Sequence, residues 1–367
     1  MSPIPTREPG RVDADAPGGR GTGRTGTARD PWLDNAKLLL VTLVVVGHTW
    51  TLLAETVVTA WIYNFLYLWH IPAFVVVTGY LSRSFTWSRP QLTRLVTGLV
   101  VPYLVFEYSL TTFRQVVGGE QFGPLFWNPH WPMWYLASLL VWRLATPLLR
   151  RVPHVLPLAV VVSLATGVST GDPLDLARTG GLLPFFVLGL LASPEQAARL
   201  RRTRVRVVAV AALVVAAAVA TLVENHLGST EWLYWRSSYD ELHVSLLVGV
   251  LGRLALLAGA GVLALSVLAL VPTGSHWFTR YGHATLVVYL LHGFVVKTAA
   301  YSAFPGWSQQ HPLPSLVVAT AAAVAVALTL AAPPVAQRLS VLVDPVAAWS
   351  RRRRQATSAG SSSRPPG

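Results

Sequence analysis

The chain contains no cysteine, and only 12% of its 367 residues are charged. The absence of cysteine excludes disulfide bonds, thiol nucleophiles and thiolate metal sites. The low charge excludes an ordinary soluble domain, in which roughly a quarter of the residues are charged. Hydrophobic residues make up 53% of the chain, and so much apolar surface can be buried only by facing lipid on many sides. The composition therefore predicts an integral membrane protein.

Several signatures of nucleotide and metal chemistry are missing as well. Neither GxxxxGK[ST] nor a well-placed GxGxxG occurs, which argues against an ATP-driven pump. The GxSxG elbow of serine hydrolases is absent. The histidines inside apolar segments show no HxxxH, HxH or HExxH spacing, so we expect no metal site.

Apolar runs fill most of the chain. A spanning helix needs roughly 20 mainly apolar residues, and about ten segments qualify, although the fifth and sixth are short. The predicted spans cover residues 35–54, 61–82, 92–114, 131–149, 153–169, 180–193, 205–224, 243–270, 283–300 and 315–339. The expected fold is an all-α membrane bundle of about ten helices. The polar ends, 1–31 and 346–367, are predicted to be disordered cytoplasmic tails around a transmembrane domain at 32–345.

The net charge of +13 is not spread evenly over the loops. Alternate loops carry most of the arginines, whereas the loops between them carry acidic residues and only Arg114, Arg178 and Arg236. This alternation is the positive-inside pattern of membrane proteins, and it places both termini in the cytoplasm. It also argues against nucleic acid as a partner. We expect a multi-pass protein of the plasma membrane whose surroundings are the lipid bilayer.

The longest outer loop, 225–242, is aromatic and polar. One interpretation is an interfacial belt, because Trp and Tyr accumulate at membrane surfaces. The alternative is a lid that faces a sugar. The sequence favours the belt without excluding the lid.

The first predicted span carries a polar face. Lys37 and His48 are eleven residues apart, which is about 20° from a whole number of helical turns and a rise of about 16 Å. Asp34 lies near the same face. A cation at one end could hold an anionic donor, and an imidazole further along could take a proton from a hydroxyl. Equally, His48 could be a structural histidine bound to a neighbouring helix, with Asp34 and Lys37 as an ion pair.

Two further spans carry polar stripes. In the second, His70 shares a face with aromatic residues, and Gly79 permits close approach of another helix. In the ninth, Thr285, Tyr289 and His292 share one face. Packing and interhelical hydrogen bonds are the simpler interpretation of both stripes.

Charged residues within spans are costly and therefore candidates for function. Glu107, Arg143 and Arg253 belong to this class. Glu107 and Arg253 both fall near the middle of their spans, so they could form a pair.

Taken in order, the motifs resemble those of a known family. They comprise Lys37 and His48 within DNAKLLLVTLVVVGHTW, the run LWHIPAFVVVTGY from Leu68 to Tyr80, a basic loop with Arg89 and Arg94 followed by Pro102-Tyr103, Trp134-Tyr135-Leu136, and the element from Tyr289 to His292. This set is similar to the membrane-bound acyltransferase type 3 family, particularly its fucose 4-O-acetylase-like branch.

The resemblance implies transfer of an acyl group, usually acetyl, from cytoplasmic acyl-coenzyme A to a hydroxyl of a sugar, a glycan or a natural product. It implies His48 as general base or relay, and we place His292 and Tyr289 with it as catalytic candidates. Lys37, Arg89 and Arg94 are expected to hold the coenzyme phosphates, and His70, Glu107 and Trp134 to bind the acceptor. The family more often has Arg where this chain has Lys37, which gives up the bidentate fork of a guanidinium.

Two other functions fit the sequence. A polytopic transporter or glycan flippase also has many helices and few intramembrane charges, but the two halves show no convincing internal repeat. A non-catalytic receptor or scaffold would tolerate replacement of the intramembrane histidines.

Overall fold

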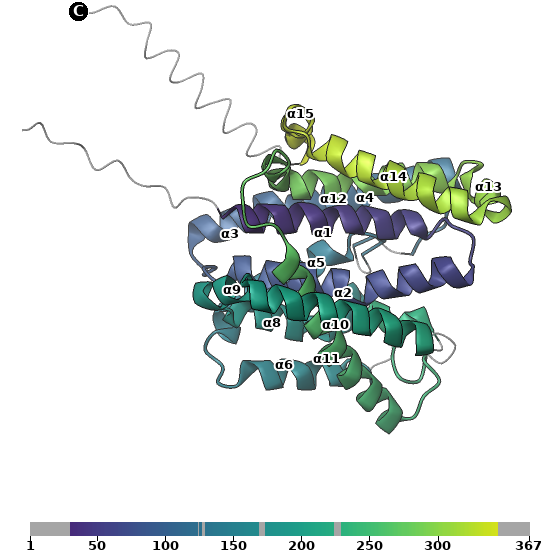
Figure 1. Ribbon diagram of the computed structural model, residues 1–367. Helices are drawn as coiled ribbons and strands as arrows, with labels where there is room; N and C mark the ends of the chain where they lie inside the picture. Colours follow the sequence, from purple (N-terminus) through teal and green to yellow (C-terminus); the bar gives the residue numbers. More distant parts are fainter. Residues whose placement is uncertain (1–29, 124, 127–128, 169–172, 224–228, 344–367) are drawn as a thin grey trace, which may run out of the picture. The chain divides into compact units, whose positions relative to one another are not determined.

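Figure 1 shows the computed structural model, which describes residues 30–343 except 124, 127–128, 169–172 and 224–228. This part of the chain is helical and contains no β-strand. The predicted tails at 1–31 and 346–367 lie outside the described residues, apart from 30 and 31. The α-helices are α1 (Pro31–Trp50), α2 (Val57–Ser82), α3 (Arg89–Leu95), α4 (Val101–Gly118), α5 (Trp134–Leu149), α6 (Val155–Ala165), α7 (Leu176–Gly181), α8 (Leu183–Leu191), α9 (Pro194–Leu200), α10 (Thr203–Val223), α11 (Leu246–Leu270), α12 (Thr285–Ala300), α13 (Phe304–Gln310), α14 (Pro312–Ala331) and α15 (Pro333–Val343).

Six helical segments of the described chain are long and apolar enough to cross a membrane. They are Val57–Ser82, Arg89–Gly118, Thr203–Leu222, Leu246–Leu270, Thr279–Ala300 and Pro312–Ala331. Every predicted span overlaps at least one helix, but several of these helices are shorter than expected, as α6 and α8 show with 11 and 9 residues. The protein is therefore a helical multi-pass membrane protein with six clear candidates for spans.

The last predicted span, 315–339, is wrong as a single helix. Helix α14 ends at Ala331, Ala332 has an extended backbone with ψ 130°, and α15 begins at Pro333. Proline lacks the N–H that would continue the hydrogen-bond ladder, but it is well suited to the first turn of a new helix. The Pro333-Pro334 pair thus divides the run.

Close backbone contacts hold the helices together where glycines face each other. A Cβ on Gly79 of α2 would lie 2.0 Å from the carbonyl oxygen of Phe186, and one on Gly189 of α8 would lie 1.9 Å from that of Val76. No side chain fits in either place, so α2 and α8 pack along their backbones. The predicted role of Gly79 is confirmed.

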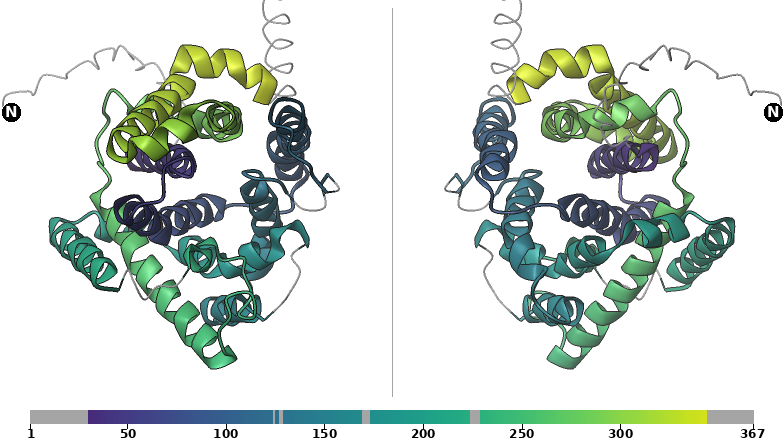
Figure 2. Two further views of the ribbon diagram at one scale, coloured as in Figure 1. Left: turned by 90° about the vertical axis from the view of Figure 1, so that its right-hand side faces the viewer. Right: turned by 90° about the vertical axis from the view of Figure 1, so that its left-hand side faces the viewer.

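Helix α1 lies inside the bundle and contacts α2, α12 and α14 (Figure 1). Most of its side chains are buried, including Asp34 and His48 of its polar face, whereas Lys37 is partly exposed. Helix α10, in contrast, lies beside α11 at the edge of the bundle in both views of Figure 2. Only 6% of its apolar window is buried, as expected for a helix that faces lipid.

The segment between α4 and α5 folds back into the bundle. Helix α4 stops at Gly118, and Gly119 turns the chain with a φ of 66°, a conformation that glycine adopts without strain. His130, further along the segment, then reaches Glu107, about three turns below the end of α4. This return brings Trp131 and Pro132 beside α1 and α12.

Candidate active site

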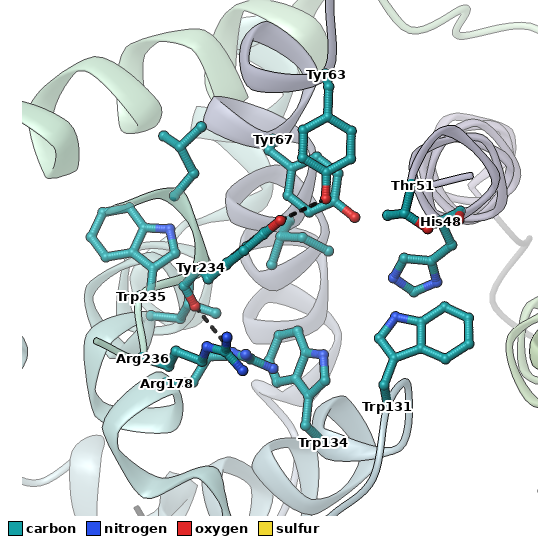
Figure 3. A pocket seen from close by; sticks show the side chains of 13 residues that line it. His48, Thr51, Tyr63, Tyr67, Trp131, Trp134, Arg178, Tyr234, Trp235 and Arg236 are labelled. Atoms are coloured by element: carbon teal, nitrogen blue, oxygen red, sulfur yellow. Dashed lines mark hydrogen bonds between the residues drawn. The ribbon is translucent and has the colours of Figure 1, made fainter. Parts of the chain in front are cut away.

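A cavity of about 250 Å³ opens at the end of the bundle where α1 stops and α2 begins. Figure 3 shows its lining, which is aromatic on most sides. The lining residues are His48, Thr51, Tyr63, Tyr67, Ile71, Trp131, Trp134, Arg178, Leu182, Leu233, Tyr234, Trp235 and Arg236. Its volume lies near the lower end of the range for small-molecule sites.

Three tyrosines form one wall of the cavity. The rings of Tyr63 and Tyr67 stack with centroids 4.1 Å apart, and the hydroxyls of Tyr63 and Tyr234 are 2.9 Å apart. Tyr63 and Tyr67 belong to the aromatic face predicted for the second span. Tyr234 comes from the 225–242 loop, of which 225–228 lie outside the described residues. Part of this loop therefore lines a cavity, as the lid interpretation requires.

His48 lies opposite the tyrosines and is 7% exposed. Its Nδ1 atom is 2.8 Å from Nε2 of His292, a fully buried residue of α12. The ring of Trp131 lies on another side of His48, with centroids 4.7 Å apart. His48 is thus held by neighbours on two sides while it still faces the cavity.

A second, smaller void begins on the inner side of His48. It measures about 10 Å³ and is lined by Val44, His48, Ile71, Phe74, Pro132, Trp134, Tyr135 and Tyr289. That volume is about the size of one water molecule at most. His48, Ile71 and Trp134 line both spaces, so His48 lies between the wide cavity and the small void.

Three side chains hold the segment that carries Trp131. The Glu107 carboxylate accepts hydrogen bonds from the backbone N–H and the ring Nδ1 of His130, at 3.0 and 2.5 Å. The Tyr289 hydroxyl donates to the carbonyl of Pro132. Arg114 donates to the carbonyl of Trp131 at 3.3 Å. Because Glu107 and Tyr289 are buried, loss of either contact would leave a polar group without a partner.

Glu120 ties the same segment to the ends of α4 and α12. It accepts from Arg114 and Tyr301, and from Lys297 at 2.8 Å. Burial acts to raise the pKa of Glu120, but these hydrogen bonds outweigh it and lower the pKa to about 2. Glu120 is therefore ionised at neutral pH and holds Arg114 in place.

Two arginines contribute positive charge to the cavity. The guanidinium of Arg178 lies over the Trp134 ring, 4.4 Å from its centroid, and donates to the Tyr234 carbonyl at 3.0 Å. It also approaches Asp175 at 3.5 Å. Arg236 approaches Glu231 at 3.3 Å. Neither carboxylate lines the cavity.

The predicted acceptor residues fall in different places. Trp134 lines both the cavity and the void. His70 is fully buried, with Nδ1 2.8 Å from the Leu66 carbonyl, and it lines neither space. Glu107 also lines neither space and reaches the site only through His130.

The predicted phosphate ligands lie away from the cavity. Lys37 pairs with Asp34 at 2.7 Å near the start of α1. Arg89 and Arg94 are exposed on α3. The structure places none of these cations against the cavity or the void.

The hypothesis that Glu107 pairs with Arg253 is wrong. Glu107 bonds to His130, whereas Arg253 donates to the carbonyls of Ser163 and Ser237 at 2.9 and 3.2 Å. The Arg253 guanidinium thus joins α11 to a neighbouring helix and to the loop before it. Two residues can lie near the middle of their spans and still point toward different neighbours.

Sequence reasoning missed Trp131, Arg178 and Arg236 as site residues. A signal was present, because Arg114, Arg178 and Arg236 are the arginines that break the positive-inside pattern. Arg178 and Arg236 line the cavity, and Arg114 supports Trp131. Arginines in the predicted outer loops thus indicated residues in and beside the cavity.

A family model for an acyltransferase domain matches residues 30–332, which is most of the chain. The chain belongs to the acyltransferase 3 family. No curated protein and no solved structure matches the acyltransferase. Membership supports an enzyme that transfers acyl groups other than aminoacyl groups, and it favours that function over a transporter or a scaffold.

Among the described residues of the acyltransferase, no group of three or more His, Asp or Glu side chains is arranged to hold a metal ion.

Proposed function

We propose that this acyltransferase moves an acyl group, usually acetyl, from acyl-coenzyme A to a hydroxyl of a sugar, a glycan or a natural product. One observation carries the proposal: His48 lines both the aromatic cavity and the void behind it. An imidazole in that position can meet an acceptor on one side and a thioester on the other. The ordered motifs favour the fucose 4-O-acetylase-like branch of the family.

We further propose about ten membrane crossings within 32–345, both termini in the cytoplasm, and a place in the plasma membrane. The alternating loop charges support this orientation. It puts the Lys37 end of α1 at the cytoplasm and the cavity at the opposite side. Acyl-coenzyme A then approaches from the cytoplasm, with Lys37, Arg89 and Arg94 holding its phosphates, and the acceptor occupies the cavity.

In this proposal, the reaction uses a general base. The imidazole of His48 takes the proton of the acceptor hydroxyl, and the hydroxyl oxygen attacks the carbonyl carbon of the thioester. The carbon–sulfur bond breaks, and the coenzyme thiolate takes the proton from the His48 imidazolium. The products are an ester and the free coenzyme thiol, so atoms and charges balance. Relay of the acyl group through His48 is the second route to the same products.

The aromatic lining suits a sugar acceptor. Sugar rings have apolar faces that pack on aromatic side chains, while the hydroxyls need polar partners at the edges. Trp131, Trp134 and Tyr234 supply such faces in the cavity. His70 and Glu107 take supporting places in this proposal, since both lie behind the walls.

The test compares His48→Gln with His311→Gln in purified protein reconstituted into bilayers. His311 is exposed at the start of α14, away from the cavity. Transfer from labelled acetyl-coenzyme A to a panel of sugars is measured. We expect His48→Gln to lose about 10² to 10⁴ of the rate and His311→Gln to keep it.

Equal transfer by both variants would rule out His48 as the catalyst. Failure of the wild type to transfer acetyl either to a sugar of the panel or to a hydroxyl compound in an extract of the cells that make it would show that the acceptor class is wrong. Glycan and metabolite profiling of a deletion strain identifies the natural acceptor.

A further inference from the structure

The cavity contains only one of the two histidines that touch each other. His48 lines it, whereas His292 lies behind His48 and lines neither the cavity nor the void. His292 is 0% exposed, so an acceptor in the cavity does not meet it. Any contribution of His292 to the reaction must pass through His48.

The hydrogen bonds of His292 require its Nδ1 atom to be a donor. Nδ1 lies 2.6 Å from the carbonyl oxygen of Tyr289 and 3.2 Å from that of Val288. Carbonyl oxygens only accept, so Nδ1 carries the proton and donates. In a neutral imidazole the other nitrogen, Nε2, is then a bare acceptor.

That assignment decides the protonation of His48. Its Nδ1 lies 2.8 Å from the bare Nε2 of His292. Two unprotonated nitrogens at this distance would repel, so Nδ1 of His48 carries a proton and donates it to His292. A neutral His48 then has its unshared electron pair on Nε2, the ring nitrogen not occupied by His292. A general base needs this form, because only an unprotonated nitrogen can accept the hydroxyl proton.

The opposite arrangement requires a buried charge. His292 could donate to His48 only if both of its nitrogens carried protons, which would make it a cation. Among the described residues, the hydrogen-bond partners of the two rings are each other and the two carbonyls, with no carboxylate. A buried cation without a counter-ion is strongly disfavoured.

We propose that His292 is a positioning residue that holds His48 in the tautomer with its proton on Nδ1. Its own orientation is set by the carbonyls at Val288 and Tyr289. The arrangement performs the orienting task of the aspartate in a Ser-His-Asp triad, with a neutral histidine in its place. This inference rests on the proposed function for its catalytic meaning, but the tautomer itself does not depend on it.

Two amide variants separate positioning from packing. In His292→Gln the amide oxygen takes the place of Nε2 and can accept from His48. In His292→Asn the amide sits one bond shorter, near the place of Nδ1, and does not reach His48. Both side chains are polar amides, so they differ mainly in reach.

The first measurement is acyl transfer at saturating acceptor. We expect His292→Gln to stay within about tenfold of the wild-type kcat, and His292→Asn to lose about 100-fold or more, given that a triad with the wrong tautomer loses about 10⁴. The KM for the acceptor stays unchanged in both, because His292 does not line the cavity. Equal losses in the two variants, or a loss confined to KM, would overturn the proposal.

The second measurement needs no activity. Nitrogen-15 NMR of protein with labelled histidine rings, in bilayers, separates protonated from bare ring nitrogens, and correlation to Cδ2 identifies Nε2. The His48 signals are those absent from His48→Gln. We expect the proton on Nδ1 in the wild type and in His292→Gln, and a redistribution toward Nε2 in His292→Asn.

A wild-type His48 with its proton on Nε2, or no change in His292→Asn, would overturn the inference. Absence of transfer by the wild type would instead reject the proposed function and leave the NMR result to decide the tautomer. Unfolding temperatures of the variants report whether they fold.

Discussion

The two ends of helix α1 differ in how their polar groups are held. At the His48 end, the side chains are buried and fixed by neighbours from α4, α12 and the segment between α4 and α5. At the other end, Lys37 is partly exposed and paired with Asp34, and Arg89 and Arg94 are exposed on α3. The polar groups at the His48 end are fixed by the fold, while those at the Lys37 end are in contact with solvent.

The difference follows from solvation. A buried polar atom must have a partner in the protein, so its position is determined by the fold. An exposed ammonium or guanidinium is satisfied by water and keeps its freedom until a ligand arrives. We infer that the acceptor side is preorganised, whereas the donor side assembles around the coenzyme. Variants at each end of α1 and beside it test this contrast.

The sharpest test fills the small void behind His48. Val44 lines that void and is 4% exposed. We expect Val44→Phe to reduce turnover about 100-fold or more, since a displacement of about 1 Å at a reacting centre can cost that much. In the proposed mechanism, the thioester reaches His48 through this void, so a larger side chain at position 44 would block it. Steady-state kinetics with acetyl-coenzyme A measure the effect.

Val44→Ala is the matched control, because it widens the void and should retain donor access. If Val44→Phe remains fully active and folded, the donor reaches His48 by another path, and the contrast between a wide and a closed side of His48 fails.

A second test removes one face of the cavity. Trp131 is held by contacts from Glu107, Arg114 and Tyr289 to its own segment. Loss of its ring in Trp131→Ala should weaken acceptor binding by about 2 kcal/mol, which is about 30-fold in KM. Trp131→Phe keeps an aromatic face and should lose far less. An unchanged acceptor KM in Trp131→Ala would show that the acceptor binds elsewhere.

At the opposite end, Lys37→Met removes the ammonium group and keeps an unbranched side chain of nearly the same length. A hydrogen bond to a charged group contributes about 1.5 kcal/mol, so the KM for acyl-coenzyme A should rise about tenfold with little change in kcat. Lys37→Arg should preserve binding. The measurement is the same transfer assay at varied donor concentration. If Lys37→Met changes the acceptor KM instead, the two ends of α1 do not divide the substrates as proposed.

The smallest expected effect concerns acid. The pKa of Glu120 is lowered from 4.5 to about 2, so ionised Glu120 stabilises the folded state. For a carboxyl with a depressed pKa, this stabilisation is complete above the unfolded value and is lost as the pH falls through the folded value. The unfolding temperature of the wild type should therefore approach that of Glu120→Gln between about pH 4.5 and 2. A constant difference in unfolding temperature across this interval would show that ionised Glu120 does not stabilise the fold.

The helical architecture was predictable because apolar length and loop charge are local properties of the sequence. Each predicted span overlaps at least one helix, and Gly79 packs as expected. The error at 315–339 had a visible cause in Pro333-Pro334. His48 and Trp134 were also predicted as site residues, and both line the cavity.

Other contacts in the cavity could not be predicted from the sequence. Trp131 lies beside His48 because Gly119 turns the chain and Glu107 captures His130. Arg178 and Tyr234 meet although they are 56 positions apart. Such contacts depend on how loops return to the bundle, and hydrophobic periodicity does not report on that.

The sequence by itself determined that this acyltransferase is a helical membrane protein with a lysine and a histidine on one face of its first long helix. Helical geometry places Lys37 and His48 on that face wherever the helix packs. Only the tertiary structure decided that His48 faces an aromatic cavity and meets His292 through Nδ1. The reason is physical: the direction of a buried hydrogen bond is set by the partners that packing brings to it, here the carbonyls behind His292.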